Sequence, residues 1–174
     1  MKRNLAEIHQ VYTSTQAFDP FETIMTQILG KWTGFRLKYR EELLAGFEKV
    51  LSTEDEDYLY FLVAVAFYDG FDRGFSKLLS QLLNQSWHRA HEDIAEMFED
   101  LKDPITIPSL FDAAKRDLDY DEGRNLSGKC IWALAKIQTV ESRRRLVLLS
   151  EHENELVRKF ALDALDHFRI DDAI

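Results

Sequence analysis

The sequence has few of the residues that interrupt helices or cross-link chains. Among its 174 residues there are one cysteine, three prolines and seven glycines. A single cysteine excludes a framework of intramolecular disulfides, and the scarcity of proline and glycine favours long helices over many tight turns. Cys130 itself lies on an apolar helical stripe, so we interpret it as a small buried hydrophobic residue rather than a nucleophile.

The chain also lacks long apolar runs and an excess of positive charge. Residues 1–9 contain no apolar run of the signal-peptide type, and the apolar segment 58–68 is too short to span a bilayer. We therefore expect a soluble cytoplasmic protein. The formal net charge is −9. A negative field repels phosphate backbones, which disfavours direct nucleic-acid binding, and it attracts a basic protein, although solubility alone also favours acidity.

What the sequence does contain is a recurring amphipathic helix. Small and apolar residues recur at helical spacing within 128–137, a pattern that buries one face of a helix. Similar stripes come before and after it, and hydrophobic residues make up 45% of the chain, enough for a core. Stripes that share one register predict stacked helical hairpins. The three stripes are Ala90, Ile94, Met97, Phe98 and Leu101; Cys130, Ala133, Leu134 and Ile137; and Val157, Ala161, Ala164, Leu165 and Phe168.

Residues 87–174 are predicted to form hairpins of regular pattern. The turn Asp103-Pro104 places a proline where a helix can start. Moving Leu110 and Phe111 forward by 36 positions gives Leu146 and Val147, so one offset fits both helices of a hairpin, and these residues are predicted to line the second helices. The predicted elements are helices at 89–102, 105–116, 128–137 and 154–168, a helix carrying Leu146, Val147 and Leu149, an acidic connection at 117–123 and a turn at 139–141.

Residues 1–86 are predicted to form helical hairpins of looser pattern. A helix at 5–12 should end at 13–15, where hydroxyl side chains compete for the backbone. Thr53 and Glu56 are predicted to form a capping box for an apolar helix at 58–67, which we expect to be buried from more than one side. Three further helices are predicted. The first starts at Asp19-Pro20, and the second carries Leu43, Leu44, Phe47, Val50 and Leu51. The third follows the turn Asp69-Gly70 and carries Phe71, Phe75, Leu78, Leu79, Leu82 and Leu83.

Two stretches carry the pattern of a known helical repeat. Residues 102–110 have an Asp-Pro turn followed by an apolar helix, and residues 154–165 have a small-residue helix that contains a Val-Arg pair. In both stretches the chain resembles the short bacterial HEAT-like repeats of the PBS-lyase type. The departures from that pattern are His91 and Ser127, which stand where Arg158 would repeat, and Val140, which replaces the turn proline.

This resemblance covers residues 88–168 and implies both a fold and a role. The implied fold is an all-α, right-handed α-solenoid of stacked antiparallel helix hairpins, in one domain with irregular hairpins in 1–86 and regular repeats in 87–174. Residues 86–94 also resemble a segment of small stand-alone bacterial HEAT-like proteins, some of which are similar to immunity proteins that neutralise a toxin. The implied role is a protein-binding module, most concretely an immunity protein that blocks a basic toxin.

Acidic residues on or near the second helices are predicted to attract such a partner. In solenoids the second helices line a concave face, where we expect binding. The acidic connection also resembles a calcium loop, but its glycine comes one position late and the closing glutamate is missing, so we predict a solvated loop. The residues predicted to contact a basic partner are Asp69, Asp72, Asp112, Asp117, Asp119, Asp121 and Glu122.

Two alternatives to a toxin-binding module stay open. A scaffold or adaptor of HEAT-like type would bind a neutral partner with little dependence on ionic strength. A metal-binding or enzymatic protein would be centred on His88 and His91, which lie within one helical turn of Glu92 and are potential zinc ligands. Their order fits neither zincin motif, so we favour a plain helix start. Because no nucleophile–base pair or phosphate-binding loop stands out, we expect neither an enzyme nor a cofactor.

Overall fold

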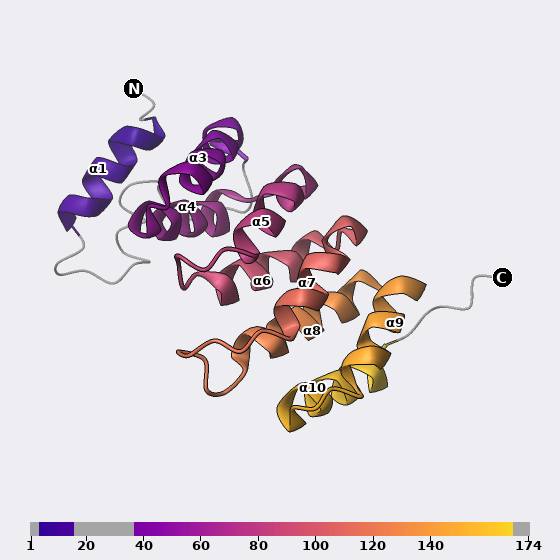
Figure 1. Ribbon diagram of the computed structural model, residues 1–174. Helices are drawn as coiled ribbons and strands as arrows, with labels where there is room; N and C mark the ends of the chain where they lie inside the picture. Colours follow the sequence, from indigo (N-terminus) through magenta and orange to yellow (C-terminus); the bar gives the residue numbers. More distant parts are fainter. Residues whose placement is uncertain (1–3, 16–36, 169–174) are drawn as a thin grey trace. The chain divides into compact units, whose positions relative to one another are not determined.

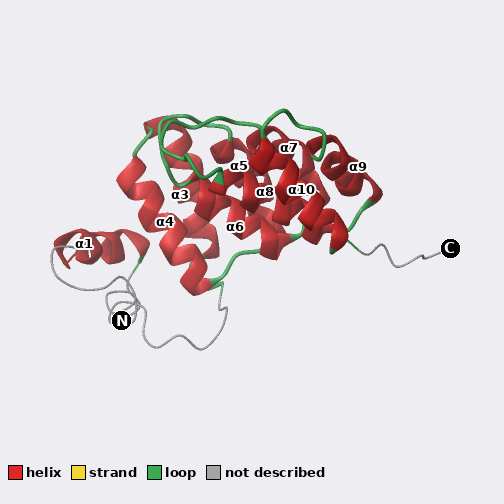
Figure 2. Ribbon diagram, turned by 90° about the horizontal axis from the view of Figure 1, so that it is seen from below, coloured by secondary structure: helices red, strands yellow, loops and turns green. Residues whose placement is uncertain are grey.

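Helices account for all the regular secondary structure in residues 4–15 and 37–168, the part of the chain that the computed structural model describes (Figure 1). No strand occurs among these residues (Figure 2), which confirms the predicted all-α class. The chain divides into two units, Met1–Phe75 and Ser76–Ile174, each of which is described by itself. The helix predicted to start at Asp19-Pro20 lies outside the described residues.

The first unit has a core formed around its most apolar helix. Its described elements are α1 (Leu5–Thr15), α3 (Arg40–Thr53), α4 (Glu56–Asp69) and the short 3₁₀ helix η1 (Arg73–Phe75). Helix α4 contacts both α1 and α3. It is buried from more than one side, as predicted, because apolar residues occupy most of its circumference. Its buried apolar residues are Leu59, Phe61, Leu62, Val63, Val65 and Ala66.

The structure explains why glycine occurs at two positions of the first unit. At Gly46 on α3, a Cβ atom would stand 2.6 Å from a methyl group of Leu62 on α4, so the Leu62 side chain would have to shift to make room for it. Gly70 ends α4 with a φ of 102°, a conformation that residues with a Cβ atom rarely adopt. The predicted turn at Asp69-Gly70 is therefore confirmed.

The first helix continues beyond its predicted end. The sequence predicts that the hydroxyl residues after Tyr12 stop α1, but the helix runs to Thr15. The hydroxyl of Thr13 donates to the carbonyl of Gln10 (3.0 Å), and the hydroxyl of Ser14 donates in the same way, three residues back (2.8 Å). The prediction was wrong because these hydroxyls bond to carbonyls within the helix instead of competing with it.

The capping box predicted for α4 does not form. Thr53 is the last residue of α3, and its hydroxyl donates to a carbonyl of that helix, the one of Lys49 (3.2 Å). The cap of α4 is Asp55, whose carboxylate accepts the backbone N–H of Tyr58 (2.9 Å). The acidic run therefore contains the cap, two positions later than predicted.

The second unit has six α-helices among its described residues. Helix α8 lies at its centre and contacts α6, α7, α9 and α10. Contacts also join α5 to α7 and α7 to α9, so α6, α8 and α10 form one row of neighbours and α5, α7 and α9 form another (Figure 1). The elements are α5 (Ser76–Leu83), α6 (His91–Leu101), η2 (Pro104–Thr106), α7 (Ile107–Ala114), α8 (Asn125–Ile137), α9 (Val140–Leu149) and α10 (Glu155–Asp166). None of the helices described in either unit is both long and apolar enough to cross a membrane.

Apolar residues at the starts of alternate helices are buried in the second unit. Ala90, Leu126 and Val157, at the starts of α6, α8 and α10, are each almost completely inaccessible to solvent. Burial of apolar side chains at these positions is the main favourable term for packing the row. The next two sets along the helices are also buried: Ile94, Cys130 and Ala161, then Met97, Ala133 and Ala164.

Two tight connections in the second unit share one geometry. Lys102 and Gln138 end α6 and α8 in the left-handed conformation, with φ of 46° and 56°. The next residue caps the following helix: Asp103 and Thr139 each accept a backbone N–H through a side-chain oxygen, at 3.2 and 3.1 Å. Asp103 and Thr139 are 36 positions apart, the offset expected from the sequence. The second turn is shorter than predicted, because α9 already begins at Val140.

One predicted core residue of α9 is exposed. The buried side of α9 is formed by Ser142, Leu146 and Leu149, which recur at helical spacing. Val147 follows Leu146 by one residue, about 100° around the helix, and its side chain is 38% exposed. The prediction that Val147 lines the buried face is therefore wrong.

Candidate functional site

Five of the seven acidic residues predicted to meet a partner lie in or beside the connection between α7 and α8. We call residues 115–124 the acidic loop; it extends away from the ends of these two helices (Figure 1). Asp112 lies on the last turn of α7, just before it. Asp69 and Asp72 belong to the first unit.

Asp69 is a buried structural residue of the first unit. Only 3% of its surface is exposed. Its carboxylate accepts the backbone N–H of Tyr39 (2.7 Å), and its carbonyl accepts the N–H of Leu37 (2.9 Å). The carboxylate therefore holds the start of α3 next to the end of α4, and its burial contradicts the predicted surface role.

Asp72 is paired within its own unit. Its two carboxylate oxygens accept from the guanidinium group of Arg40 at 2.6 and 3.0 Å, and one also accepts the N–H of Gly74 (2.8 Å). The hydrogen bond from Arg40 lowers the pKa of the Asp72 carboxyl below its ordinary value. The Asp72 carboxylate, which was predicted to attract a partner, is therefore already paired with Arg40 of its own unit.

Asp121 anchors the acidic loop instead of projecting from it. It is 5% exposed, and its carboxylate accepts the N–H groups of Asn125 (2.7 Å) and Leu126 (2.9 Å), the first residues of α8. Arg124, at the N-cap position, has a φ of 55° and gives no side-chain cap. Asp121, three positions before the N-cap residue Arg124, therefore caps the start of α8 with its side chain. The burial of this carboxylate contradicts its predicted place on the surface.

Asp112 and Asp117 are exposed but have cationic neighbours. Asp117 lies 2.9 Å from Arg124, and Asp112 lies 2.9 Å from Lys115. The two carboxylate side chains remain 82% and 65% exposed. Solvent screens such pairs strongly, so both acids still contribute to the surface charge.

The outer side of the acidic loop combines carboxylates with an aromatic ring. Asp117, Asp119 and Glu122 are exposed, and Tyr120 between them is 38% exposed. The guanidinium group of Arg89 lies 5.3 Å from the centre of the Tyr120 ring. Tyrosine is enriched among residues that dominate binding energies in protein interfaces. The sequence patterns did not single out Tyr120, although its place inside a run of acids was a usable signal.

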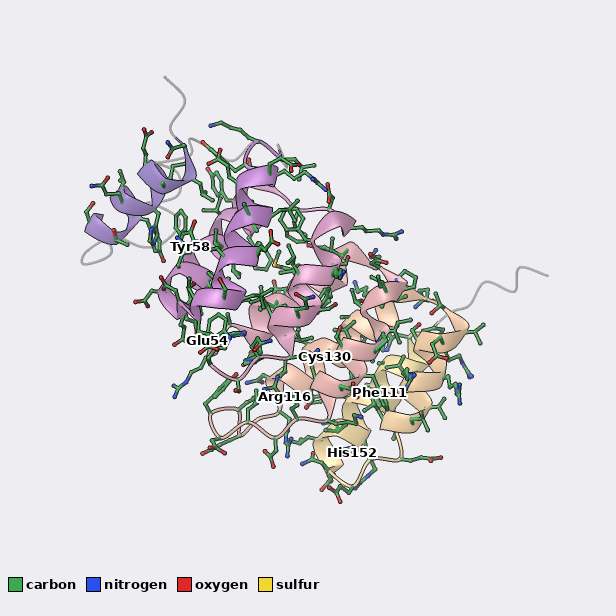
Figure 3. All side chains as sticks on the ribbon, turned by 45° about the horizontal axis from the view of Figure 1, so that its top comes forward. Glu54, Tyr58, Phe111, Arg116, Cys130 and His152 are labelled. Atoms are coloured by element: carbon green, nitrogen blue, oxygen red, sulfur yellow. The ribbon has the colours of Figure 1, made fainter. Side chains whose placement is uncertain are left out.

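Long-range hydrogen bonds fix the backbone of the acidic loop. Arg116, labelled in Figure 3, donates to the carbonyls of Leu83 (2.7 Å) and Gln85 (3.2 Å), which lie at the end of α5 and just after it. Arg124 donates to the carbonyl of Arg116 (2.8 Å). The start of the loop is therefore tied to the end of α5 and to Gln85, and Arg124 ties the end of the loop to its start, so the loop is pre-organised for binding.

His88 is a hydrogen-bonded core residue next to this loop. It is 2% exposed, and its Nε2 atom lies 2.9 Å from the carbonyl of Leu82. Its Nδ1 atom accepts the backbone N–H of Ala90 (3.1 Å). Since a carbonyl needs a donor, the proton of the neutral ring is assigned to Nε2. Burial lowers the pKa of His88 below its ordinary value, which favours this neutral form.

His91 joins the connection at 84–90 to the acidic loop. It is 1% exposed, and its ring stacks on His88 with centroids 4.3 Å apart. Its Nε2 atom lies 2.8 Å from the carbonyl of Gln85, and its Nδ1 atom lies 2.6 Å from the hydroxyl of Tyr120. All four ring nitrogens of the pair thus have partners in the chain. Within the described ranges, no group of three or more His, Cys, Asp or Glu side chains is placed to hold a metal ion.

The departures from the repeat pattern at His91 and Ser127 are explained by comparison with Arg158, which fits the pattern. Arg158 donates to two carbonyls of the connection that precedes α10 (2.8 and 2.6 Å). His91 is placed to donate to Gln85 in the connection that precedes α6. Ser127 is too short for this contact, its buried hydroxyl has no hydrogen-bond partner among the described residues, and Arg124 ties the acidic loop instead.

A second group of carboxylates recurs at helical spacing on α6, and only Glu92 among its members was named from the sequence, beside His88 and His91. Glu92, Asp93 and Glu99 are half-buried, and burial is the main cause that raises the pKa of each carboxyl. Glu96, between them, pairs with Lys129 of α8. Because Lys129 lies among these acids, this face of the second unit is partly neutralised.

Shallow clefts occur elsewhere on the surface. In the second unit, a cleft of about 360 Å³ is lined by residues of α10 alone. In the first unit, a cleft of about 180 Å³ lies among α1, α3 and α4. No residue of the acidic loop lines either cleft. The lining residues are Glu155, Arg158, Lys159, Leu162 and Asp163 in the first case and Ala6, His9, Lys49, Asp55 and Tyr58 in the second.

Comparisons with known proteins identify no relative. No family model, no curated protein and no solved structure matches the chain. A function therefore has to be argued from the geometry and charge of the chain itself, and the acidic loop is the candidate site.

Proposed function

We propose that the chain is a protein-binding helical-repeat module whose acidic loop receives a basic surface of a partner protein. In its most concrete form it is a cytoplasmic immunity protein that neutralises a basic toxin, without catalytic activity of its own. One observation carries the proposal: a loop with a fixed backbone presents exposed carboxylates around a half-exposed tyrosine. These are Asp117, Asp119 and Glu122, around Tyr120.

A right-handed, HEAT-like stack is the architecture we propose for this module. Its support is the pair of helix rows in the second unit, α6–α8–α10 and α5–α7–α9. The two tight connections with one geometry, at Lys102-Asp103 and Gln138-Thr139, agree with repeated hairpins. Helical-repeat proteins offer extended surfaces for partners, which fits a role in binding.

The acidic loop has the physical properties that a binding site for a basic protein requires. Its carboxylates speed the encounter with a positively charged surface. Arg116 and Arg124 fix its backbone, so little conformational entropy is lost when a partner binds. Tyr120 offers an apolar ring with a polar tip, a combination that suits the centre of an interface.

Capture of a partner from the native host tests the proposal. The wild-type chain is compared with a variant that carries Asp117→Asn, Asp119→Asn and Glu122→Gln. A matched control, Glu151→Gln, Glu153→Gln and Asp166→Asn, removes three exposed acids of the same unit outside the loop. We expect the wild type and the control to retain the same basic protein at low salt, and the loop variant to bind it about tenfold more weakly or worse.

Two outcomes would contradict the proposal. Retention of no basic protein at either low or moderate salt would remove the proposed partner class. Equal weakening in the loop variant and the control would mean that net charge, and not the acidic loop, attracts the partner. An intact fold of each variant is verified by circular dichroism.

An adaptor with a neutral partner is the second candidate, and the exposed aliphatic residues of α9 favour it. Val140 is 76% exposed, and Val147 and Leu148 lie on the same outward side of the helix. Apolar side chains gathered on one side of a surface helix are typical of interaction sites. Binding that survives moderate salt and the loop variant, but is lost with Leu148→Glu, would favour this candidate over the first.

A further inference from the structure

The stacked histidines connect three segments of the second unit at one place. His91 belongs to α6, its Nε2 atom contacts the carbonyl of Gln85 in the connection at 84–90, and its Nδ1 atom contacts Tyr120 in the acidic loop. His88 stacks on it with an angle of 26° between the rings. The position of Tyr120, and with it the outer side of the loop, thus depends on this pair.

The hydrogen bonds of His88 require a neutral ring. Its Nδ1 atom accepts the N–H of Ala90, the N-cap residue of α6, which has no cap from its own side chain. A proton on Nδ1 would place two donors face to face at 3.1 Å. Since a backbone N–H cannot accept, this bond has to break when His88 is protonated, and the start of α6 loses the contact.

His91 responds differently to a proton. Its Nδ1 atom faces the hydroxyl of Tyr120, which can accept as well as donate, so that contact can survive protonation. Two positively charged rings at 4.3 Å would repel each other in a buried site. Charge on either ring therefore opposes charge on the other, and the stack is stable when both are neutral.

The groups that face His88 from the neighbouring elements add to this preference. From α5 comes the carbonyl of Leu82, and from the start of the acidic loop comes the guanidinium group of Arg116. Burial lowers the pKa of His88 most, the Leu82 carbonyl opposes the shift, and Arg116 lowers the pKa further. The indole ring of Trp87 lies against its edge, with centroids 4.7 Å apart. Of the titratable groups, His91 stacks on His88 and contacts Tyr120 in turn. The other titratable side chains on these elements are Lys77 on α5, Arg89 in the connection at 84–90, Glu92, Asp93, Glu96, Glu99 and Asp100 on α6, and Lys115, Asp117, Asp119, Asp121, Glu122 and Arg124 in the acidic loop.

We propose that His88 and His91 form an acid-sensitive latch that fixes the acidic loop while both rings are neutral and releases it when His88 is protonated. The latch is a property of the free protein. Its biological meaning rests on the proposed function: a partner bound through the acidic loop would be released in acid. Histidine is suited to this task because its ordinary pKa lies in the range that mild acidification crosses.

Hydrogen–deuterium exchange of the purified chain, read by mass spectrometry, tests the latch without any partner. Exchange is compared at about pH 7 and about pH 5.5, on either side of the ordinary histidine pKa, after correction for the intrinsic change of exchange rate. We expect amides in 84–90 and 115–124 to exchange about tenfold faster in acid, while amides inside α8 stay protected.

Three variants make the test specific. His88→Gln keeps one acceptor and one donor but does not titrate, so the acid response of the acidic loop should disappear. Tyr120→Phe removes the hydroxyl that His91 contacts, so the loop should exchange faster at both pH values. His152→Gln is the matched control, because His152 accepts the N–H of Asn154 at the same 3.1 Å but lies in the connection before α10. It should leave the acid response unchanged.

The proposal is overturned if acid leaves exchange in 115–124 unchanged in the wild type, or if His88→Gln keeps the full acid response. Should His88→Gln fail to fold, ¹⁵N spectra of the histidine rings in the wild type decide instead. We expect His88 to be neutral with its proton on Nε2 at about pH 7, and an imidazolium ring there would end the proposal. Exchange needs no partner and partner capture at neutral pH needs no latch, so the two proposals can fail separately.

Discussion

The tight connections and the acidic loop of the second unit are held in place by different kinds of contact. The tight connections at 102–103 and 138–139 each consist of one left-handed residue and one capping residue, and the hydrogen bonds that cap the next helix join residues close together in the sequence. The acidic loop at 115–124 depends on contacts with residues far away in the sequence, such as the one between Tyr120 and His91, 29 positions apart. Order in the first case is local, whereas in the second it is tertiary.

This difference indicates where function can reside. A tight connection has only two residues, of which one supplies the left-handed turn and the other the cap of the next helix. The acidic loop is fixed by Arg116, Tyr120, Asp121 and Arg124, and its carboxylates Asp117, Asp119 and Glu122 remain exposed to solvent. Loops positioned by a rigid scaffold often carry binding residues for this reason.

The largest effect should come from the carboxylate that anchors the acidic loop. Asp121→Ala leaves two N–H groups at the start of α8 without their acceptor, and we expect a loss of about 2–3 kcal/mol in unfolding free energy. Asp119→Ala, at an exposed position two residues earlier, should change it by less than about 0.5 kcal/mol. Urea unfolding followed by circular dichroism measures both, and equal effects would refute the distinction between anchoring and exposed acids.

Acid should destabilise the acidic loop more than the tight connections. The folded state holds His88 neutral, with its pKa below the ordinary value, so the unfolded chain binds more protons in mild acid. The stabilising contribution is complete above about pH 6.5 and falls by up to about 1.4 kcal/mol per pH unit as pH drops toward the folded pKa. The urea midpoint at several pH values checks this. His88→Gln should flatten the profile, and an unchanged slope would contradict the assignment.

A smaller effect is expected for the cap in a tight connection. Thr139→Ala removes the acceptor for the N–H of Ser142 (3.1 Å) and the partner of a capping box. We expect a loss of about 1 kcal/mol. Val140→Ala, next to it and 76% exposed, is the control and should be close to neutral. A larger loss at Thr139 than at Asp121 would reverse the comparison between the two kinds of connection.

The smallest effect should be a gain in stability. Lys102 adopts a φ of 46°, which costs a residue with a Cβ atom energy that glycine avoids. Lys102→Gly should raise the unfolding free energy by about 0.5–1 kcal/mol. Lys102→Ala keeps the Cβ atom and should give no gain, so the pair of variants isolates the backbone term in thermal unfolding. A gain in both variants would point to the charge instead.

The same division explains which parts of the fold the sequence could predict. The stripe on α8, the turn at Asp103 and the helix start at Asn154 are specified by neighbouring residues, and all three were predicted correctly. Local signals failed at Asp55, because several acceptors in one acidic run compete to cap α4. Local spacing alone therefore does not decide between adjacent capping residues.

The candidate site was predictable only in part, for a related reason. Asp119 and Asp121 are the same residue type in the same run, yet one is exposed and the other is buried against α8. Nothing within the run distinguishes them, because the choice is made where the loop meets the helix. The contact between His91 and Tyr120 has no local signature either, since it joins residues that only the folded chain brings together.

Cys130 gives the chain a built-in reporter of unfolding. It is the single cysteine of the sequence, and it lies on the central helix α8, where Figure 3 labels it. Its side chain is fully buried. Burial also raises the pKa of the thiol, which suppresses the reactive thiolate. A thiol reagent can label this protein only after α8 has opened, so the rate of modification would follow the opening of the second unit without any added dye or tag.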